Sequence, residues 1–228
     1  MPRAAIIGAG RVGTTLGGRL LAAGWEVRYG SRDPAHSRKL KAVLQEQPAA
    51  SGSTVSEAVA WVASGSDGGG AILLAVPGSA LATRHACASF ARSLGLQAEG
   101  QVVIDATNPL DGHGNGLVWE RGHSHVYKAF NTVGVEHMAR PDGSLVTGQQ
   151  LTLMYAGAEE RQADVAALIR AVGFLPQWVG PLRHARTLEA LAELYIHLGS
   201  GMGGAPLWAD ADGTRRYHFQ VLRRGQHS

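Results

Sequence analysis

Cysteine is almost absent from this sequence. Cys87 is the only cysteine among 228 residues, so no disulfide can form within the chain, which fits a reducing cytoplasm. Its neighbours Ala86 and Ala88 favour a helix in which the thiol is buried or half-buried. No apolar run approaches the length of a membrane span, and the first residues lack the pattern of a signal peptide. We therefore expect a soluble cytoplasmic protein with no membrane partner.

Charged residues are also few, at 17% of the sequence, and the net charge is only +3. The pairs Arg215-Arg216 and Arg223-Arg224 are too short to form a basic tract, so nucleic acid is not expected as a partner. Hydrophobic residues make up 45% of the sequence, which is typical of a globular chain. Since no linker or internal repeat divides residues 1–228, we expect a single domain.

A glycine-rich loop, Gly8-Ala9-Gly10-Arg11-Val12-Gly13, follows the apolar run 4–7 and precedes a periodic helix. Glycines placed between a strand and a helix allow a tight turn and let a pyrophosphate come close to the backbone. The helix N-terminus then supplies free N–H groups and the positive end of its dipole. The sequence therefore predicts a dinucleotide site at this loop. The helix should bury one face, formed by Val12, Leu16, Leu20 and Ala23.

The acidic residue that would mark an NAD site is missing. The second predicted strand, 26–30, is followed by Ser31 and Arg32, where an NAD-specific site would carry Asp or Glu for the ribose 2′-hydroxyl. A guanidinium group suits a 2′-phosphate, and the serine hydroxyl adds a donor. Taken alone, Arg32 could be a surface arginine and Ser31 a turn residue. Their position at the end of the second strand favours NADP.

Strand and helix patterns alternate along the rest of the chain. This alternation predicts an α/β fold with a Rossmann-type, doubly wound and mostly parallel sheet, followed by a short C-terminal helix and tail. The run 71–76 is apolar at every position, as in a strand buried on both faces. Asp33 and Pro34 are suited to cap and begin a helix. Further strands are expected at 102–105, 126–130, 151–155 and 174–179, and helices at 35–46, 56–63, 78–94, 159–171 and 188–198.

Asp105, at the end of a predicted strand, has two interpretations. It could act as a general base, or it could anchor the following loop by accepting a hydrogen bond from the backbone of Thr107 or Asn108. We favour the loop anchor. A long loop also carries Asp111 and the histidines His113, His123 and His125, but this spacing matches no common metal template, and a polar loop is favoured.

Glu189, Glu193 and His197 lie on one face of a predicted late helix, which is a metal-like spacing. A solvated face opposite an apolar stripe explains these residues as simply, and no metal site is expected. The stripe is either core or a dimer interface. It consists of Leu188, Leu191, Leu194 and Leu198.

Six short stretches carry a resemblance to known proteins: 7–13, 30–34, 74–77, 105–110, 128–132 and 179–186. The stretches Lys128-Ala129-Phe130-Asn131-Thr132 and 179–186 are the most specific. Together the six stretches resemble the family of NADP oxidoreductases that use the 8-hydroxy-5-deazaflavin coenzyme. They also resemble the cytoplasmic reductase domain of membrane metalloreductases with six transmembrane helices.

The resemblance implies that the nucleotide lies across the C-terminal ends of the strands, with the nicotinamide near residues 131–133. In the deazaflavin enzymes a lysine after the Ser-Arg pair helps to hold the 2′-phosphate. By spacing that position is His36, and Arg38 or Lys39 could replace it. The expected cofactor-binding residues are Gly8, Ala9, Gly10, Arg11, Val12, Gly13, Ser31, Arg32, Arg38, Ala75, Val76, Pro77, Asn108, Asn131, Thr132 and Val133.

Enzymes of this kind pass hydride directly between two cofactors, so the resemblance implies no dedicated catalytic acid or base. We expect hydride transfer between NADP(H) and a flavin (FMN or FAD) or deazaflavin acceptor, through which ferric iron could be reduced indirectly. The alternatives are an NADP-dependent dehydrogenase of a small carbonyl or imine, and a non-catalytic NADP(H)-binding sensor. Homodimerisation through the late helix is expected from the resemblance alone.

The C-terminal part, from about residue 180 to 228, is expected to help form the acceptor cleft. Residues 199–214 look like an insertion relative to the family, and they lie where the acceptor should bind. Within this segment, Met202 and Trp208 could either cover an acceptor ring or pack the tail onto the domain.

Overall fold

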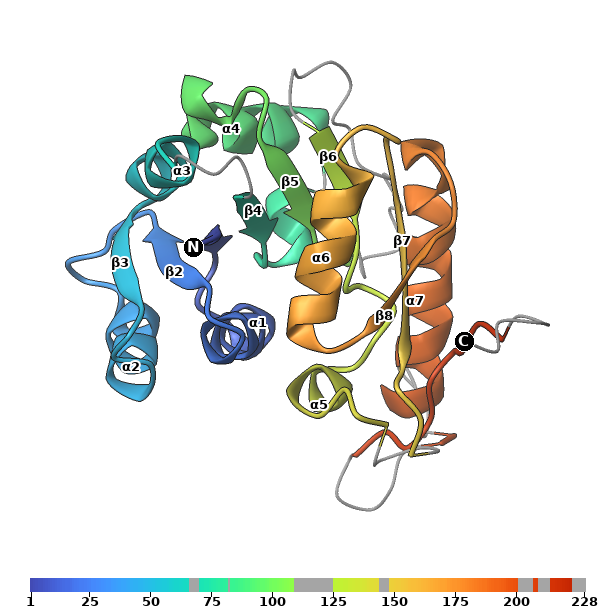
Figure 1. Cartoon of the computed structure of the whole chain (residues 1–228). Helices are drawn as coiled ribbons and strands as arrows, with labels where there is room; N and C mark the ends of the chain where they lie inside the picture. Colours follow the sequence, from blue (N-terminus) through green and yellow to red (C-terminus); the bar gives the residue numbers. More distant parts are fainter. Residues whose placement is uncertain are drawn as a thin grey trace.

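The computed structural model describes residues 1–65, 70–81, 83–108, 125–143, 148–200, 207–208 and 214–222. Its central feature is an eight-stranded sheet in the order β3-β2-β1-β4-β5-β6-β7-β8 (Figure 1). The strands are β1 (Arg3–Ile7), β2 (Glu26–Ser31), β3 (Ser51–Thr54), β4 (Ala71–Leu74), β5 (Val102–Asp105), β6 (His125–Lys128), β7 (Thr152–Gly157) and β8 (Leu175–Trp178).

Neighbouring strands are parallel throughout the sheet except for β6 and β7, which pair antiparallel. The first six strands follow the order 3-2-1-4-5-6 of a doubly wound dinucleotide-binding fold. This confirms the predicted α/β class and the mostly parallel Rossmann-type sheet.

Helices cover both faces of the sheet (Figure 1). The helices are α1 (Arg11–Ala22), α2 (Arg38–Glu46), α3 (Val55–Ala63), α4 (Arg84–Leu94), α5 (Val135–Ala139), α6 (Gln162–Val172) and α7 (Ala185–Ser200), with short 3-10 turns η1 (Gly78–Leu81), η2 (Leu96–Ala98) and η3 (Leu182–His184). Helix α7 packs against β6 and β7, and α1 begins directly after β1.

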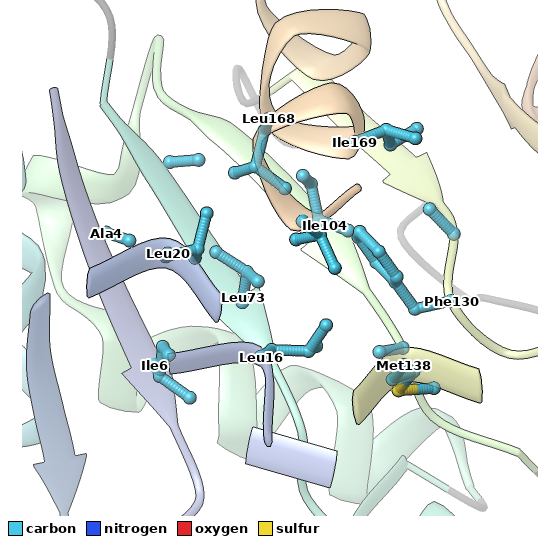
Figure 2. Packing of buried hydrophobic residues seen from close by; sticks show 14 of the residues in the cluster. Ala4, Ile6, Leu16, Leu20, Leu73, Ile104, Phe130, Met138, Leu168 and Ile169 are labelled. Atoms are coloured by element: carbon cyan, nitrogen blue, oxygen red, sulfur yellow. The ribbon is translucent and has the colours of Figure 1, made fainter. Parts of the chain in front are cut away.

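The core lies on both sides of the central strands because successive side chains of a strand point to opposite faces. Ile6, Leu73 and Ile104 pack against α1 and α6 on one face, where Leu16, Leu20 and Leu168 meet them (Figure 2). The alternate residues Ile7, Ile72, Leu74 and Val103 pack on the other face with Val59 and Val62 of α3. Cys87 of α4 is also buried, as predicted.

Several predicted boundaries were wrong. The helix predicted at 35–46 begins at Arg38, and its cap is Ser37, whose hydroxyl accepts a hydrogen bond from the backbone of Leu40. Asp33 instead closes the turn before the helix, because its carboxylate accepts from the backbone N–H of His36 at 3.2 Å. The strand predicted at 71–76 ends at Leu74, and the helix predicted at 78–94 is divided into η1 and α4.

Two elements were not predicted at all. Strand β3 is polar, Ser51-Gly52-Ser53-Thr54, and forms at the edge of the sheet through its pairing with β2. Helix α5 has only five residues, too few to show a helical period. In α1 the predicted buried position Ala23 is exposed, because the helix ends there as its C-cap.

Candidate nucleotide-binding site

The C-terminal ends of β1, β2, β4, β5 and β6 lie along one edge of the sheet because these strands are parallel. The segments predicted to bind a nucleotide follow directly after these ends. The hydrogen bonds between neighbouring strands continue into these segments. The backbone N–H of Ala75 donates to the backbone carbonyl of Ile7 at 2.9 Å, and that of Ala129 donates to the backbone carbonyl of Asp105 at 3.1 Å. The fold therefore gathers the predicted residues at one edge.

The three glycines of the loop differ in what a side chain at each position would meet. Gly8 has φ +117°, and a Cβ atom there would lie 2.4 Å from the carbonyl oxygen of Ala75. A Cβ atom on Gly13 would lie 2.1 Å from the carbonyl oxygen of Gly8. Gly10, the N-cap of α1, has no neighbouring atom within 4 Å of its Cβ position. Gly8 and Gly13 thus shape the turn, whereas Gly10 leaves open space in front of the helix N-terminus.

The first turn of α1 carries no acidic side chain, and no side chain caps it. Its free backbone N–H groups and the positive end of the helix dipole therefore face the open space beside Gly10. This arrangement suits an anionic phosphate.

A contact that the sequence reasoning missed fixes α1 close to β2. A Cβ atom on Gly17 would lie 1.9 Å from the hydroxyl of Tyr29, so the helix can approach the strand only with glycine at this position. The Tyr29 hydroxyl donates to Gln47 at 2.7 Å, and the Gln47 amide donates to the carbonyl of Thr14 at 2.9 Å. Burial raises the pKa of Tyr29, which keeps the hydroxyl a donor.

Ser31 and Arg32 stand at the end of β2, beside the glycine loop. Ser31 is half-buried and pairs with Thr54 of β3, whereas Arg32 is exposed. Within the described part of the chain, the guanidinium of Arg32 makes no hydrogen bond or ion pair. Arg38 is also exposed, at the first residue of α2. An open glycine cradle and an uncommitted guanidinium at this strand end fit a dinucleotide with a 2′-phosphate.

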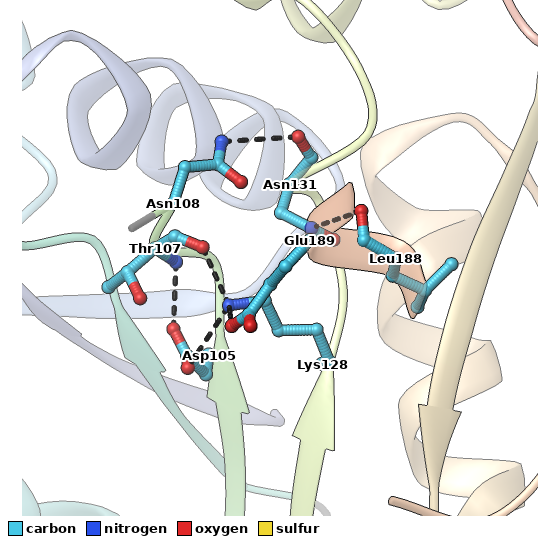
Figure 3. A network of polar contacts seen from close by, with 7 residues as sticks. All are labelled: Asp105, Thr107, Asn108, Lys128, Asn131, Leu188 and Glu189. Carbon is cyan, nitrogen blue, oxygen red and sulfur yellow. Dashed lines mark hydrogen bonds and ion pairs between the residues drawn. The ribbon is translucent and has the colours of Figure 1, made fainter. Parts of the chain in front are cut away.

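A buried ion cluster lies at the ends of β5 and β6 (Figure 3). The ammonium of Lys128, fully buried, contacts Asp105 at 3.3 Å and Glu189 at 2.8 Å, and it donates to the carbonyl of Thr107 at 2.6 Å. Asp105 also accepts from the backbone N–H of Thr107 at 2.7 Å. The predicted role of Asp105 as a loop anchor is confirmed, and the ion pair with Lys128 is an additional one.

Glu189 was placed wrongly by the sequence reasoning. Instead of lying on a solvated face of the late helix, it is only 9% exposed and bonds Lys128, while Glu193 and His197 are exposed. Leu194 of the predicted apolar stripe is 48% exposed. The buried face of α7 therefore includes Glu189, whose carboxylate contacts the Lys128 ammonium of β6. A lysine within the mainly apolar run 126–130 is the signal that could have revealed this pairing.

The segment after β6 is held by α7. Asn131 is buried and donates through its side-chain amide to the carbonyl of Leu188 at 3.0 Å, and the backbone N–H of Gly134 donates to the hydroxyl of Tyr195 at 3.2 Å. The side-chain amide of Asn108 donates to the carbonyl of Asn131 at 3.2 Å. Phe130 has φ +64°, a left-handed conformation that is uncommon for a bulky residue. Such strain concentrates at functional sites.

Three oxygen atoms in this region are buried and accept no hydrogen bond. They are Asn108 Oδ1, Asn131 Oδ1 and Glu189 Oε2 (Figure 3). Thr132 and Val133 are also buried, so the predicted nicotinamide-flanking segment presents little side chain to solvent. Residues 75–77 after β4 are partly or fully exposed.

The tail crosses α5, β7 and α7. Arg215 pairs with Glu136 at 3.3 Å, and the ring of His218 lies 2.7 Å from the carbonyl of Thr152. Trp208 packs edge-on against Tyr217 at 5.5 Å, so it packs the tail, one of the two roles considered for it. Met202, Asp111, His113 and His123 lie outside the described residues, and His125 begins β6.

Among the described residues, no three His, Cys, Asp or Glu side chains are grouped so that they could hold a metal ion. In the same part of the chain, no helix is both long and apolar enough to cross a membrane.

Residues 3–109 match the family model of NADP oxidoreductases dependent on coenzyme F420, which is an 8-hydroxy-5-deazaflavin. The match confirms the predicted resemblance over residues 3–109, which are just under half of the 228-residue chain. The matched residues include the glycine loop, Ser31, Arg32 and the end of β5. The match supports NADP(H) binding and NADP-dependent oxidoreduction, the chemistry that the family model describes.

Solved structures share the fold. A candidate F420-dependent NADP reductase from Arthrobacter sp. FB24 has 22% identity and a TM-score of 0.73, covering 96% of this chain and 99% of that one. A Sinorhizobium meliloti protein has 25% identity and a TM-score of 0.57, covering 80% and 87%. An imine reductase from Aspergillus terreus has 20% identity and a TM-score of 0.58, covering 88% and 61%. No curated protein matches the sequence.

Proposed function

We propose that this protein is an NADPH-dependent oxidoreductase that transfers hydride between NADP(H) and a flavin or deazaflavin acceptor. The observation that carries the NADP part is the exposed guanidinium of Arg32 at the end of β2, beside the open glycine cradle. The family model that matches residues 3–109 is described as dependent on coenzyme F420, and this description supports a deazaflavin acceptor. The similar Arthrobacter structure covers 96% of this chain and is covered over 99% of its own, which supports a single-domain organisation.

Different segments of the site would bind different parts of the nucleotide. The loop 8–13 and the N-terminus of α1 would bind the pyrophosphate through backbone N–H groups. Arg32, with Ser31 and Arg38, would bind the 2′-phosphate through charged hydrogen bonds. The exposed turn 75–77 would lie along the middle of the nucleotide. Because Gly10 leaves its surroundings open, the phosphates can approach the backbone there.

The segment 131–133 and Asn108 would lie beside the nicotinamide, which supplies the hydride when NADPH is bound. This segment is clamped to α7 by the bonds of Asn131 and Gly134, so its backbone is fixed before any ligand arrives. Fixed geometry favours direct hydride transfer between two stacked rings, since the protein then contributes orientation and the exclusion of water. The late helix and tail would form the other wall of the acceptor cleft.

Imine reduction is the second candidate, because structures of imine reductases share the fold. The chain spans 61% of the Aspergillus terreus imine reductase and 62% of the Myxococcus stipitatus one. More than a third of each of those chains therefore has no counterpart here.

The deciding experiment is anaerobic oxidation of NADPH by the purified protein, with FMN, FAD, coenzyme F420 or a cyclic imine supplied separately. Turnover with one flavin-type acceptor and none with the imine is the expected result. Turnover of the imine alone would establish the second candidate. Tight NADPH binding without turnover of any acceptor would instead identify a nucleotide sensor and overturn the proposal.

A further inference from the structure

The tail residues 214–222 are joined to helix α7 by a reciprocal pair of hydrogen bonds. The hydroxyl of Tyr217 donates to the backbone carbonyl of Tyr195, and the hydroxyl of Tyr195 donates to the backbone carbonyl of Tyr217 at 3.4 Å. The two rings pack against each other with their centroids 4.7 Å apart. Each tyrosine side chain therefore bonds the backbone of the other residue, which fixes the tail against α7.

Gly199 makes this contact possible. It lies one helical turn after Tyr195 in α7, and a Cβ atom there would lie 2.6 Å from the hydroxyl oxygen of Tyr217 and 2.4 Å from Nε of Arg215. No real Cβ atom comes so close to another atom, so a side chain at this position would push both tail side chains away. Because glycine leaves this space open, the hydroxyl of Tyr217 can reach the helix backbone.

Tyr195 also bonds the segment that precedes α5. Its hydroxyl accepts a hydrogen bond from the backbone N–H of Gly134, the N-cap of α5, at 3.2 Å. Tyr195 is only 2% exposed, and burial raises the pKa of its hydroxyl, which therefore stays protonated. A single buried hydroxyl thus connects Gly134 on one side to the tail on the other.

The tail contacts α5 directly as well. The backbone carbonyl of Tyr217 lies 2.9 Å from Nε2 of His137, and the guanidinium of Arg215 pairs with Glu136 at 3.3 Å. Arg215 also lies over the ring of Tyr195, 5.8 Å from its centroid. Displacement of the tail would therefore remove contacts from Tyr195 and from α5 at the same time.

We infer that the tail is a strap that sets the position of residues 131–134, and that it acts through Tyr195, which is a positioning residue. This inference rests on the proposed function, which places the nicotinamide beside residues 131–133. The side chain of Asn131 bonds α7 at one end of the segment, and the Tyr195 hydroxyl bonds Gly134 at the other end. Since a small misplacement of reacting groups slows a reaction steeply, the strap should affect the rate of hydride transfer more than the affinity for the nucleotide.

The test uses substitutions that do not touch residues 131–134. Gly199→Ala should displace the side chains of Tyr217 and Arg215 while α7 is kept, since alanine is the better helix former. Tyr217→Phe removes only the hydroxyl that reaches α7, and it carries both measurements if Gly199→Ala fails to fold. Glu193→Gln, an exposed position on the same helix, is the control.

Hydrogen–deuterium exchange followed by mass spectrometry is the first measurement, and it needs no nucleotide. In both variants the tail and residues 131–139 should exchange faster than in the wild type, while β1, β2, β4 and β5 should exchange at the wild-type rate. The control should match the wild type throughout. Faster exchange confined to the tail would overturn the inference, because the tail would then not hold the segment.

Steady-state kinetics are the second measurement. With an acceptor that the wild type reduces, both variants should lower kcat, by up to about 100-fold for a displacement of about 1 Å, and should leave KM for NADPH nearly unchanged. A wild-type kcat in variants whose residues 131–139 exchange faster would contradict the positioning role. If the wild type reduces no acceptor, the proposed function fails, and the exchange measurement still decides whether the tail holds the segment.

The double variant Gly199→Ala/Tyr217→Phe shows whether the two substitutions act on one contact. Each single substitution breaks the hydrogen bond between the Tyr217 hydroxyl and the backbone of Tyr195. The double variant should therefore lower kcat no further than Gly199→Ala alone. Losses that multiply would show two independent routes and would contradict a strap fastened at this contact.

Discussion

The carbonyl oxygen of Ala75 lies 2.4 Å from the position that a Cβ atom would occupy on Gly8. The turn after β1 and the turn after β4 are therefore in direct backbone contact, with no room for a side chain between them. This contact fixes the position of the glycine loop relative to the turn after β4 in the candidate site. Gly10 lies on the open side of the same loop, where nothing stands within 4 Å of its Cβ position.

Alanine at Gly10 should mainly weaken nucleotide binding, whereas alanine at Gly13 should mainly lower the stability of the fold. Gly10→Ala enters open space with φ −88°, so it should lower the free energy of unfolding by less than about 1 kcal/mol while blocking the approach of a pyrophosphate. Gly13→Ala would press on the backbone of Gly8 and should cost about 3 kcal/mol, the upper end of overpacking effects. Urea unfolding and NADPH titration measure the two effects. Wild-type NADPH affinity in Gly10→Ala would contradict the loop assignment.

Replacing Arg32 by Ala should weaken NADPH binding by about 1.5–3 kcal/mol, because charged hydrogen bonds to the 2′-phosphate are lost. NADH binding should barely change, since NADH has no phosphate at that position. Fluorescence titration with both nucleotides checks the prediction. Lys41→Ala, an exposed position further along α2, is the matched control for a general loss of positive charge. An equal loss for both nucleotides would refute the 2′-phosphate assignment.

The parts of the site that could be predicted from the sequence depend on local chemistry. A glycine loop between an apolar run and a periodic helix can be recognised within a few residues, and the position of Arg32 follows from the end of the same short unit. The strands are apolar because they are buried on both faces, so their approximate positions were also visible. The boundaries of the helices and strands could not be predicted as closely. Asp33 and Pro34 are residue types that commonly begin a helix, but the backbone geometry makes Ser37 the cap of α2.

The remainder depends on contacts between distant residues. Glu189 is 61 positions from Lys128 in the sequence, and the helical period cannot show which face of α7 turns toward the sheet. The polar strand β3 exists because β2 offers it an unpaired edge. Both features are decided by a tertiary partner, and neither has a periodic signal of its own.

Lys128→Met should lower the free energy of unfolding by about 3–5 kcal/mol, because it leaves a buried carboxylate without its cation. The double variant Lys128→Met/Glu189→Gln should lose less than the sum of the two single variants, since one of the stranded carboxyl groups is then neutral by construction. Urea unfolding of the four proteins gives the coupling. Additive losses would show that Lys128 and Glu189 do not act as a pair.

His137 and His218 should make the folded protein less stable in acid. Their rings lie 5.9 Å apart, and each Nε2 faces a backbone carbonyl, that of Tyr217 for His137 and that of Thr152 for His218. In the neutral form of each ring the hydrogen is therefore on Nε2, which donates it to the carbonyl. Both Nδ1 atoms are buried without a partner, so protonation would bury an N–H group that has no acceptor.

Burial lowers the pKa of both histidines below 6.5, and for His218 the neighbouring His137 acts in the same direction. Between the folded pKa values and 6.5, the unfolded chain binds more protons than the folded one, so stability falls as the pH drops through this window and is fully present above it. The slope cannot exceed about 1.4 kcal/mol per pH unit for each histidine. Urea unfolding from pH 7.5 to 5 should show this loss, and His218→Gln should reduce its slope. A wild-type unfolding free energy that is flat across pH 5–6.5 would show that the tail does not hold these rings neutral.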